Sequence, residues 1–195
     1  MRAWIIALNV EAEAVRSAVP REDRLYLSGV GKVNAAIAAA RALAAGADEL
    51  VNVGLCGGFG AGMKIGDVYE VARAVEYDFD LSAINGTCIG QLNERTSPYF
   101  ELSVRGDPRW PAKILATGDR FVDSDADLGI FRQLGAELRD MEGAAVAHVA
   151  EAAGVPCREL KCVSDVYGRG SMTMQFVSHT EEALKCLHDA VISWR

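Results

Sequence analysis

The chain has 195 residues, 50% of them hydrophobic and 24% charged, so it can bury one sizeable core and we expect one domain over residues 1–195. A formal net charge of -7 argues against a nucleic-acid partner, because nucleic-acid affinity depends on Lys and Arg that neutralise phosphates. The sequence contains no apolar run of about 18 residues and no signal-peptide pattern, so we expect no membrane contact and a cytoplasmic location.

Strands and helices alternate in the first half of the chain. The apolar and glycine patterns predict a strand over 4–8, a helix from Val10 capped by Asn9, a strand over 25–30, an Ala-rich helix over 33–45, and strands over 50–53 and 67–75. The glycine-dense segment 54–62 is predicted to be a turn in which the backbone closely approaches another group. Residues 78–107 are polar and irregular, which is typical of a functional excursion or an oligomer contact.

The alternation resumes after this excursion. It predicts a strand over 113–116, a helix over 126–134, a strand over 137–141, a helix over 142–153, a strand over 157–164, and a last helix that Ser178 opens and that ends near Trp194. This order predicts a three-layer α/β/α fold with a mixed, mostly parallel central sheet.

Three acidic residues lie where predicted strands end. Glu142 and Asp165 follow two apolar runs, and Glu11 lies at the first strand-to-helix junction. Each alone could be a first-turn carboxylate that stabilises a helix dipole. Because ligands of α/β sheets bind outside the carboxyl ends of the strands, three acids in such places favour an enzyme. Periodicity alone does not bring them together in space.

Other site chemistries fit the sequence poorly. The five cysteines are an odd number without C-x-x-C spacing, and His148, His179 and His188 fall on predicted helices without metal-ligand spacing. We therefore expect reduced thiols, no metal and no cofactor. The glycine patterns at 29–34 and 54–62 complete neither the dinucleotide fingerprint nor the P-loop.

Seven motifs are spread along the chain: ALNVE (7–11), SGVGKVNAA (28–36), NVGLCGG (52–58), IGDV (65–68), TGDRFV (117–122), MEGAA (141–145) and VSDV (163–166). Their order resembles the nucleoside phosphorylase and nucleosidase superfamily, and most of all the 5'-methylthioadenosine/S-adenosylhomocysteine nucleosidases. The excursion adds YDFDLSA (77–83) and GQL (90–92), which resemble the nucleosidase branch and imply a homodimer contact. The resemblance implies hydrolysis of the N-glycosidic bond of such nucleosides, with release of adenine.

The resemblance also implies roles for individual residues. Glu11 would position and deprotonate the attacking water, and Glu142 would bind the ribose hydroxyls, with Met141 packed against the sugar. Asp165 would protonate the leaving base at N7, and Ser164 would orient its carboxyl group.

The resemblance also implies which residues contact the purine and which surround the rest of the substrate. Phe121 would stack on the purine, and the backbone of Val122 would bind the adenine edge. The remaining residues that the resemblance places around the substrate are Leu55, Cys56, Gly57 and Phe176.

Hydrolysis and phosphorolysis need different groups beside the sugar. A phosphorylase must hold a dianion, usually with arginine, whereas a hydrolase needs a base beside a water. The first junction offers Glu11, and the next arginine after it is Arg16, which favours hydrolysis. Three further arginines could still reach the pocket from elsewhere, namely Arg95, Arg120 and Arg169.

Three departures from the family pattern bear on this function. Leu55 replaces a serine that the family usually places near the water, the segment between Pro20 and Leu25 is short, and residues 167–170 lack the family's second acid after Ser-Asp. The preference for the 5' substituent therefore stays open. A purine nucleoside phosphorylase, a hydrolase of a futalosine-type nucleoside and a non-catalytic nucleoside-binding protein are the alternatives.

Overall fold

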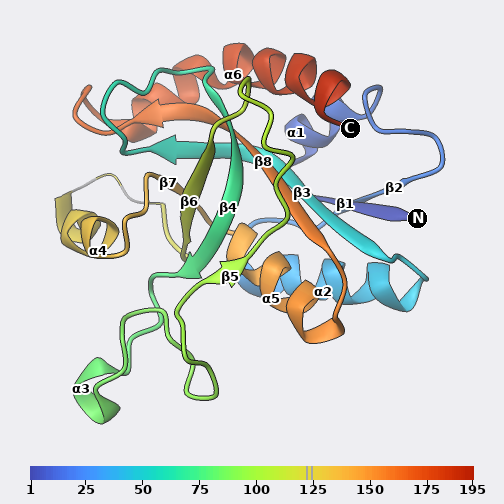
Figure 1. Ribbon diagram of the computed structural model, residues 1–195. Coiled ribbons are helices and arrows are strands. Elements are labelled where there is room, and N and C mark those ends of the chain that lie inside the picture. Colours follow the sequence, from blue (N-terminus) through green and yellow to red (C-terminus); the bar gives the residue numbers. More distant parts are fainter. Residues whose placement is uncertain (122, 124) are drawn as a thin grey trace.

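The computed structural model of the chain describes residues 1–121, 123 and 125–195 (Figure 1). In this part of the chain one sheet has eight strands: β1 (Arg2–Ile6), β2 (Arg24–Leu27), β3 (Glu49–Gly58), β4 (Val68–Glu76), β5 (Phe100–Glu101), β6 (Ala112–Thr117), β7 (Leu138–Asp140) and β8 (Cys157–Val166). The helices are α1 (Asn9–Val15), α2 (Lys32–Ala44), α3 (Ser82–Asn85), α4 (Leu128–Gln133), α5 (Gly143–Ala153) and α6 (Met172–Trp194), with a 3-10 turn at Asp125–Asp127.

The sheet is mixed and mostly parallel, as predicted. Strand β3 pairs with β1 and β8 in parallel and with β7 antiparallel. Strand β8 also pairs with β4, and β4 connects through β6 to β7. Strands β3, β8, β4, β6 and β7 therefore form a closed ring, while β1 with β2, and β5, extend it on two sides. Closure removes free edges from the strands that surround the site.

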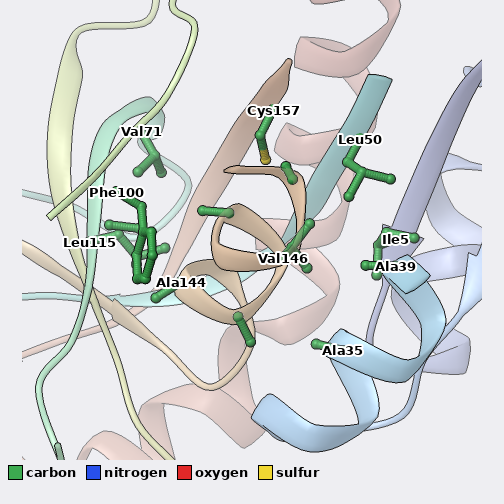
Figure 2. Packing of buried hydrophobic residues seen from close by; sticks show 14 of the residues in the cluster. Ile5, Ala35, Ala39, Leu50, Val71, Phe100, Leu115, Ala144, Val146 and Cys157 are labelled. Atoms are coloured by element: carbon green, nitrogen blue, oxygen red, sulfur yellow. The ribbon is translucent and has the colours of Figure 1, made fainter. Parts of the chain in front are cut away.

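Helices cover both faces of the sheet (Figure 1). Helices α1 and α6 lie on one face, and α2 and α5 lie on the other. The buried face of α2 consists of alanines, among them Ala35 and Ala39, and Val146 lies on the side of α5 that faces it, whereas Ala144 points toward Leu115 and Phe100 (Figure 2). Such short side chains let the two helices pack closely, which holds their N-termini beside each other at the site.

A second core lies between the sheet and α6. It includes Trp4 and Trp194, whose rings meet edge to face with centroids 6.2 Å apart. Aromatic pairs prefer this arrangement to a face-to-face stack. The helix is therefore fixed against the sheet beside the strand β8, whose carboxyl end bears Asp165.

Strand β3 corrects one prediction. The segment 54–58 was expected to be a turn, but it continues the strand to Gly58. A Cβ atom at Gly54 would lie 3.0 Å from Glu11 Oε1, and one at Gly57 would lie 2.9 Å from Arg139 Nε. Glycine is therefore needed because other side chains lie against the strand. The turn itself comes later and includes Gly62, whose φ is +82°.

Two helix starts also differ from the prediction. The N-cap of α1 is Leu8 rather than Asn9, and the Glu11 side chain accepts a hydrogen bond from the Leu8 amide at 2.9 Å. Helix α6 begins at Met172, behind the N-cap Ser171, and not at Ser178. The excursion at 78–107 is irregular, as predicted, apart from α3 and the short strand β5.

Candidate functional site

A pocket of about 250 Å³ opens at the carboxyl ends of β1, β3, β7 and β8. Glu11, Glu142 and Asp165 all line it, so the fold brings the three strand-end acids together. Seven further residues that the sequence singled out also line the pocket, namely Leu55, Cys56, Gly57, Phe121, Met141, Ser164 and Phe176. Val122 lies outside the described residues.

Glu11 is held by the backbone of two different elements. Its Oε2 accepts the hydrogen bond from Leu8 N, and its Oε1 accepts one from Leu55 N at 2.8 Å. The side chain is buried, and burial raises its pKa, although the two amide hydrogen bonds act in the opposite direction. Leu55 thus contributes its backbone amide to the orientation of this acid.

Glu142 is the N-cap residue of α5 and lies beside the start of α2. Its Oε1 accepts a hydrogen bond from Gly31 N at 2.8 Å. Burial, followed by the negative charge of Asp140, raises the pKa of Glu142 to about 7. Ligand groups that donate hydrogen bonds would favour the ionised form of this carboxyl group.

Asp165 has two side-chain partners. Its Oδ2 accepts a hydrogen bond from Ser164 Oγ at 2.9 Å, and its Oδ1 accepts one from Arg139 Nη2 at 3.1 Å. Only 1% of Asp165 is exposed, and burial raises its pKa, while the charge of Arg139 and the hydrogen bond from Ser164 lower it. Burial and the neighbouring donors therefore act on the pKa of Asp165 in opposite directions.

A second buried network supports the floor of the pocket. Lys161 Nζ donates to Asp140 Oδ2 at 2.7 Å and also to Asn52. Asp140 in turn accepts from Thr117 Oγ1 at 2.6 Å and from Gly143 N at 2.9 Å. The network joins β3, β6, β7 and β8 to the first residue of α5, so it fixes the place at which Glu142 enters the site.

Two aromatic rings cover the pocket. Phe121 and Phe176 meet edge to face with centroids 5.8 Å apart, and Phe121 is 42% exposed. An exposed aromatic ring at the mouth of a pocket is suited to stacking on a planar ligand.

The arginine in the pocket is not one that the sequence singled out. Arg95 pairs with Glu151, Arg120 pairs with Asp127, and both Arg16 and Arg169 are exposed. The residue that lines the pocket is Arg139 on β7. The available signal was the charged pair Arg139-Asp140, which lies inside a predicted strand directly before Met141-Glu142.

Residues 1–121, 123 and 125–195 contain neither a candidate metal site nor a candidate membrane-spanning helix. There, no three His, Cys, Asp or Glu side chains gather in a way that could hold a metal ion. Nor does that part of the chain have a helix with both the length and the apolar character to cross a membrane.

Comparisons with known proteins identify the family of the chain. A family model described as "Phosphorylase superfamily" matches residues 24–193. A 5'-methylthioadenosine/S-adenosylhomocysteine nucleosidase of Treponema pallidum is 32% identical over 72% of this chain, and the match spans 65% of that protein's length, just under two thirds. An aminodeoxyfutalosine nucleosidase of Campylobacter jejuni is 31% identical, with 74% of this chain and 68% of the relative covered.

A solved structure shares the fold. It is a nucleosidase from S. pneumoniae, described as binding a transition-state inhibitor, and it superposes with a TM-score of 0.85 at 24% identity, covering 100% of this chain and 98% of the other. Together with the family model, these similarities identify the chain as a member of the phosphorylase superfamily, most similar within it to the nucleosidases.

Proposed function

We propose that the chain hydrolyses the N-glycosidic bond of 5'-methylthioadenosine and S-adenosylhomocysteine-type nucleosides, releasing adenine and a thioribose. The names of the relatives support this activity. The observation that carries it is the gathering of Glu11, Glu142 and Asp165 around one pocket. The same gathering argues against a protein that binds nucleosides without converting them, since binding alone needs no set of three buried acids.

Glu11 is the base that activates water in this proposal. It accepts hydrogen bonds from two backbone amides, so the main chain orients its carboxylate. A carboxylate repels a phosphate dianion but attracts the proton of a water molecule, which favours hydrolysis over phosphorolysis. Water attack on C1' would transfer one proton to Glu11.

Glu142 and Met141 form the sugar end of the site. The Glu142 carboxylate can accept hydrogen bonds from both ribose hydroxyls, and its charge stabilises an oxocarbenium-like transition state. Burial raises the pKa of Glu142 to about 7, so part of the carboxyl group is protonated at neutral pH. Hydrogen bonds from the two ribose hydroxyls would favour its ionised form when the substrate binds. Met141, half-buried beside it, packs against the sugar.

Asp165 is the general acid in this proposal. As the C1'–N9 bond breaks and its electron pair moves to the base, the proton of Asp165 passes to N7, so the base leaves neutral. Ser164 orients the carboxyl group, and Phe121 stacks on the purine. Val122 remains the proposed backbone contact to the adenine edge. Leu55, Cys56, Gly57 and Phe176 form the surrounding walls.

The test is adenine release from 5'-methylthioadenosine in phosphate-free buffer made with ¹⁸O-water. We expect free adenine at a rate that does not change when phosphate is added, and one ¹⁸O atom at C1' of the sugar. A requirement for phosphate, with a sugar 1-phosphate as product, would instead establish a phosphorylase.

A futalosine-type nucleoside is the second candidate substrate, because the Campylobacter jejuni relative named for such a nucleoside is as similar to this chain as the Treponema pallidum protein. Both candidates share the bond that is cleaved and differ beyond the 5' carbon. Comparing kcat/KM across 5'-methylthioadenosine, S-adenosylhomocysteine and aminodeoxyfutalosine separates them.

Assembly and location extend the proposal. We infer a homodimer with one 195-residue domain in each subunit, in which residues 77–92 lie near the contact, since Ile84 is 82% exposed there and large apolar side chains favour burial. Sedimentation equilibrium tests the dimer. The free cysteines fit a reducing cytoplasm, and the proposed products fit a role in methionine salvage.

A further inference from the structure

Arg139 is a buried cation at the place that the proposed function gives to the leaving base. Only 3% of the residue is exposed, and its Nη2 donates to Asp165 Oδ1 at 3.1 Å. Its guanidinium carbon lies 4.5 Å from the centre of the Phe121 ring. The guanidinium therefore contacts both groups that the mechanism assigns to the base, namely the acid and the stacking ring.

Strand β3 shows at which end of the pocket Arg139 lies. Gly54 lies against Glu11, whereas Gly57 lies against Arg139 and Asp165. The two glycines are three strand residues apart, which is roughly 10 Å. Arg139 is thus at the base end of the pocket and not at the water end, so it is poorly placed to hold a phosphate beside Glu11.

The two classes of purine base differ in the groups that they present at this end. Adenine offers an acceptor at N7 and an amino donor at C6, whereas a 6-oxopurine offers acceptors at both N7 and O6. A protonated Asp165 supplies one donor, for N7. A guanidinium has only donors, so it suits O6 and not an amino group.

We infer that Arg139 makes this site accept 6-oxopurine bases in addition to adenine. The inference rests on the proposed hydrolysis and specifies its leaving group. The Asp165 carboxyl group can still accept a hydrogen bond from the amino group of adenine, whereas O6 receives a hydrogen bond from Arg139. As the C1'–N9 bond breaks, the electron pair passes to the base, Asp165 gives its proton to N7, and the guanidinium stabilises the charge that develops on O6.

The test compares 5'-methylthioadenosine with 5'-methylthioinosine, which differ at the base alone. We expect the wild-type protein to cleave both. Arg139→Met should lower kcat/KM for the inosine compound by about 10- to 100-fold more than for the adenosine compound, because it removes a charged hydrogen bond that only O6 receives. Arg139→Lys should retain part of the inosine activity. Circular dichroism and urea unfolding verify that both variants fold.

Product binding supplies a readout that needs no turnover. Calorimetry should show that Arg139→Met weakens hypoxanthine binding more than adenine binding; if the Met variant does not fold, Arg139→Gln takes its place. The inference would be overturned if the wild-type protein cleaved only the adenosine compound, or if the variants lost activity on both nucleosides by the same factor. Either result would leave the hydrolase proposal intact. If neither nucleoside yields a free base without phosphate, the proposed function itself fails.

Discussion

Replacement of Glu11 by glutamine tests the proposed base with little change in shape. The two carboxylate oxygens accept hydrogen bonds from Leu8 N at 2.9 Å and Leu55 N at 2.8 Å. A glutamine side chain has one acceptor oxygen, and its amide nitrogen would face the other backbone donor. The variant therefore loses the catalytic charge and one of the two hydrogen bonds.

The expected effects on stability and on activity differ greatly in size. Leaving one buried amide without its acceptor costs about 1–3 kcal/mol, and the relief of a buried negative charge offsets part of this, so we expect a net loss of about 1 kcal/mol. A domain of ordinary stability, about 5–15 kcal/mol, stays folded after such a loss. Loss of a general base, in contrast, lowers kcat by about 10²- to 10⁴-fold.

Initial rates of adenine release and urea unfolding of the same samples separate these effects. The matched control is Glu13→Gln on the same helix, because Glu13 is exposed and should change neither quantity measurably. Calorimetry with an unreactive nucleoside should show that Glu11→Gln still binds. A variant that is folded and retains more than about a tenth of the wild-type rate would refute the role of Glu11 as the base.

Three further substitutions probe other buried ionisable groups. Asp165→Asn should lower kcat by about 10²- to 10⁴-fold while nucleoside binding in calorimetry persists; unchanged turnover would remove this acid from the mechanism. Burial raises the pKa of Glu159 from 4.5 to about 8, so the folded state holds a proton that the unfolded state has lost, and stability falls as pH rises by about 1.4 kcal/mol per pH unit between these values. Glu159→Gln should therefore flatten the dependence of urea stability on pH between 5.5 and 7.5, and parallel slopes would contradict this. Lys161→Met leaves Asp140 as an uncompensated buried charge and should cost about 3–5 kcal/mol in urea unfolding. A double variant with Asp140→Asn should recover part of that loss, and no recovery would argue against the pair.

The order of elements and the position of the three acids at strand ends could be predicted from local patterns. Alternating apolar runs and helical segments predict a mostly parallel sheet, and such a sheet brings the carboxyl ends of its strands to one side. Glu11, Glu142 and Asp165 each follow or end a strand, but β7, which leads to Glu142, runs antiparallel to β3, so the parallel pattern alone does not bring Glu142 to the other two acids. Their roles in catalysis remain predictions that the variants above test.

The glycines of β3 show what local patterns miss. A glycine-dense run predicts a turn when the residues are considered alone. In the fold, Gly54 and Gly57 are extended strand residues whose missing Cβ atoms make room for Glu11 and Arg139. The need for glycine thus arises from residues that are distant in sequence, which no window along the chain contains.

The start of α6 was missed for a related reason. Ser178 has the local spacing of a capping box, but the helix already begins at Met172. There Asp123 accepts hydrogen bonds from the Met172 amide at 2.7 Å and from the Thr173 hydroxyl at 2.6 Å. A tertiary partner 49 residues away in sequence therefore stabilises the first turn together with the local N-cap Ser171, whose hydroxyl accepts a hydrogen bond from the Met174 amide.

Strand β7 contributes charges that act on the pKa values of two site acids, Asp165 and Glu142. Adjacent strand residues point to opposite faces, so Arg139 meets Asp165 while Asp140 meets Lys161. Burial raises the pKa of both acids; the charge of Arg139 opposes this shift at Asp165, whereas the charge of Asp140 adds to it at Glu142. The raised pKa of Asp165 favours the protonated acid that the proposed mechanism needs, whereas Glu142 would need hydrogen bonds from the ribose to favour its ionised form. Arg139 and Asp140 are both buried, so β7 is buried on both faces and places one charge on each of them. These two charges act on the pKa values of the site acids on either side of the strand.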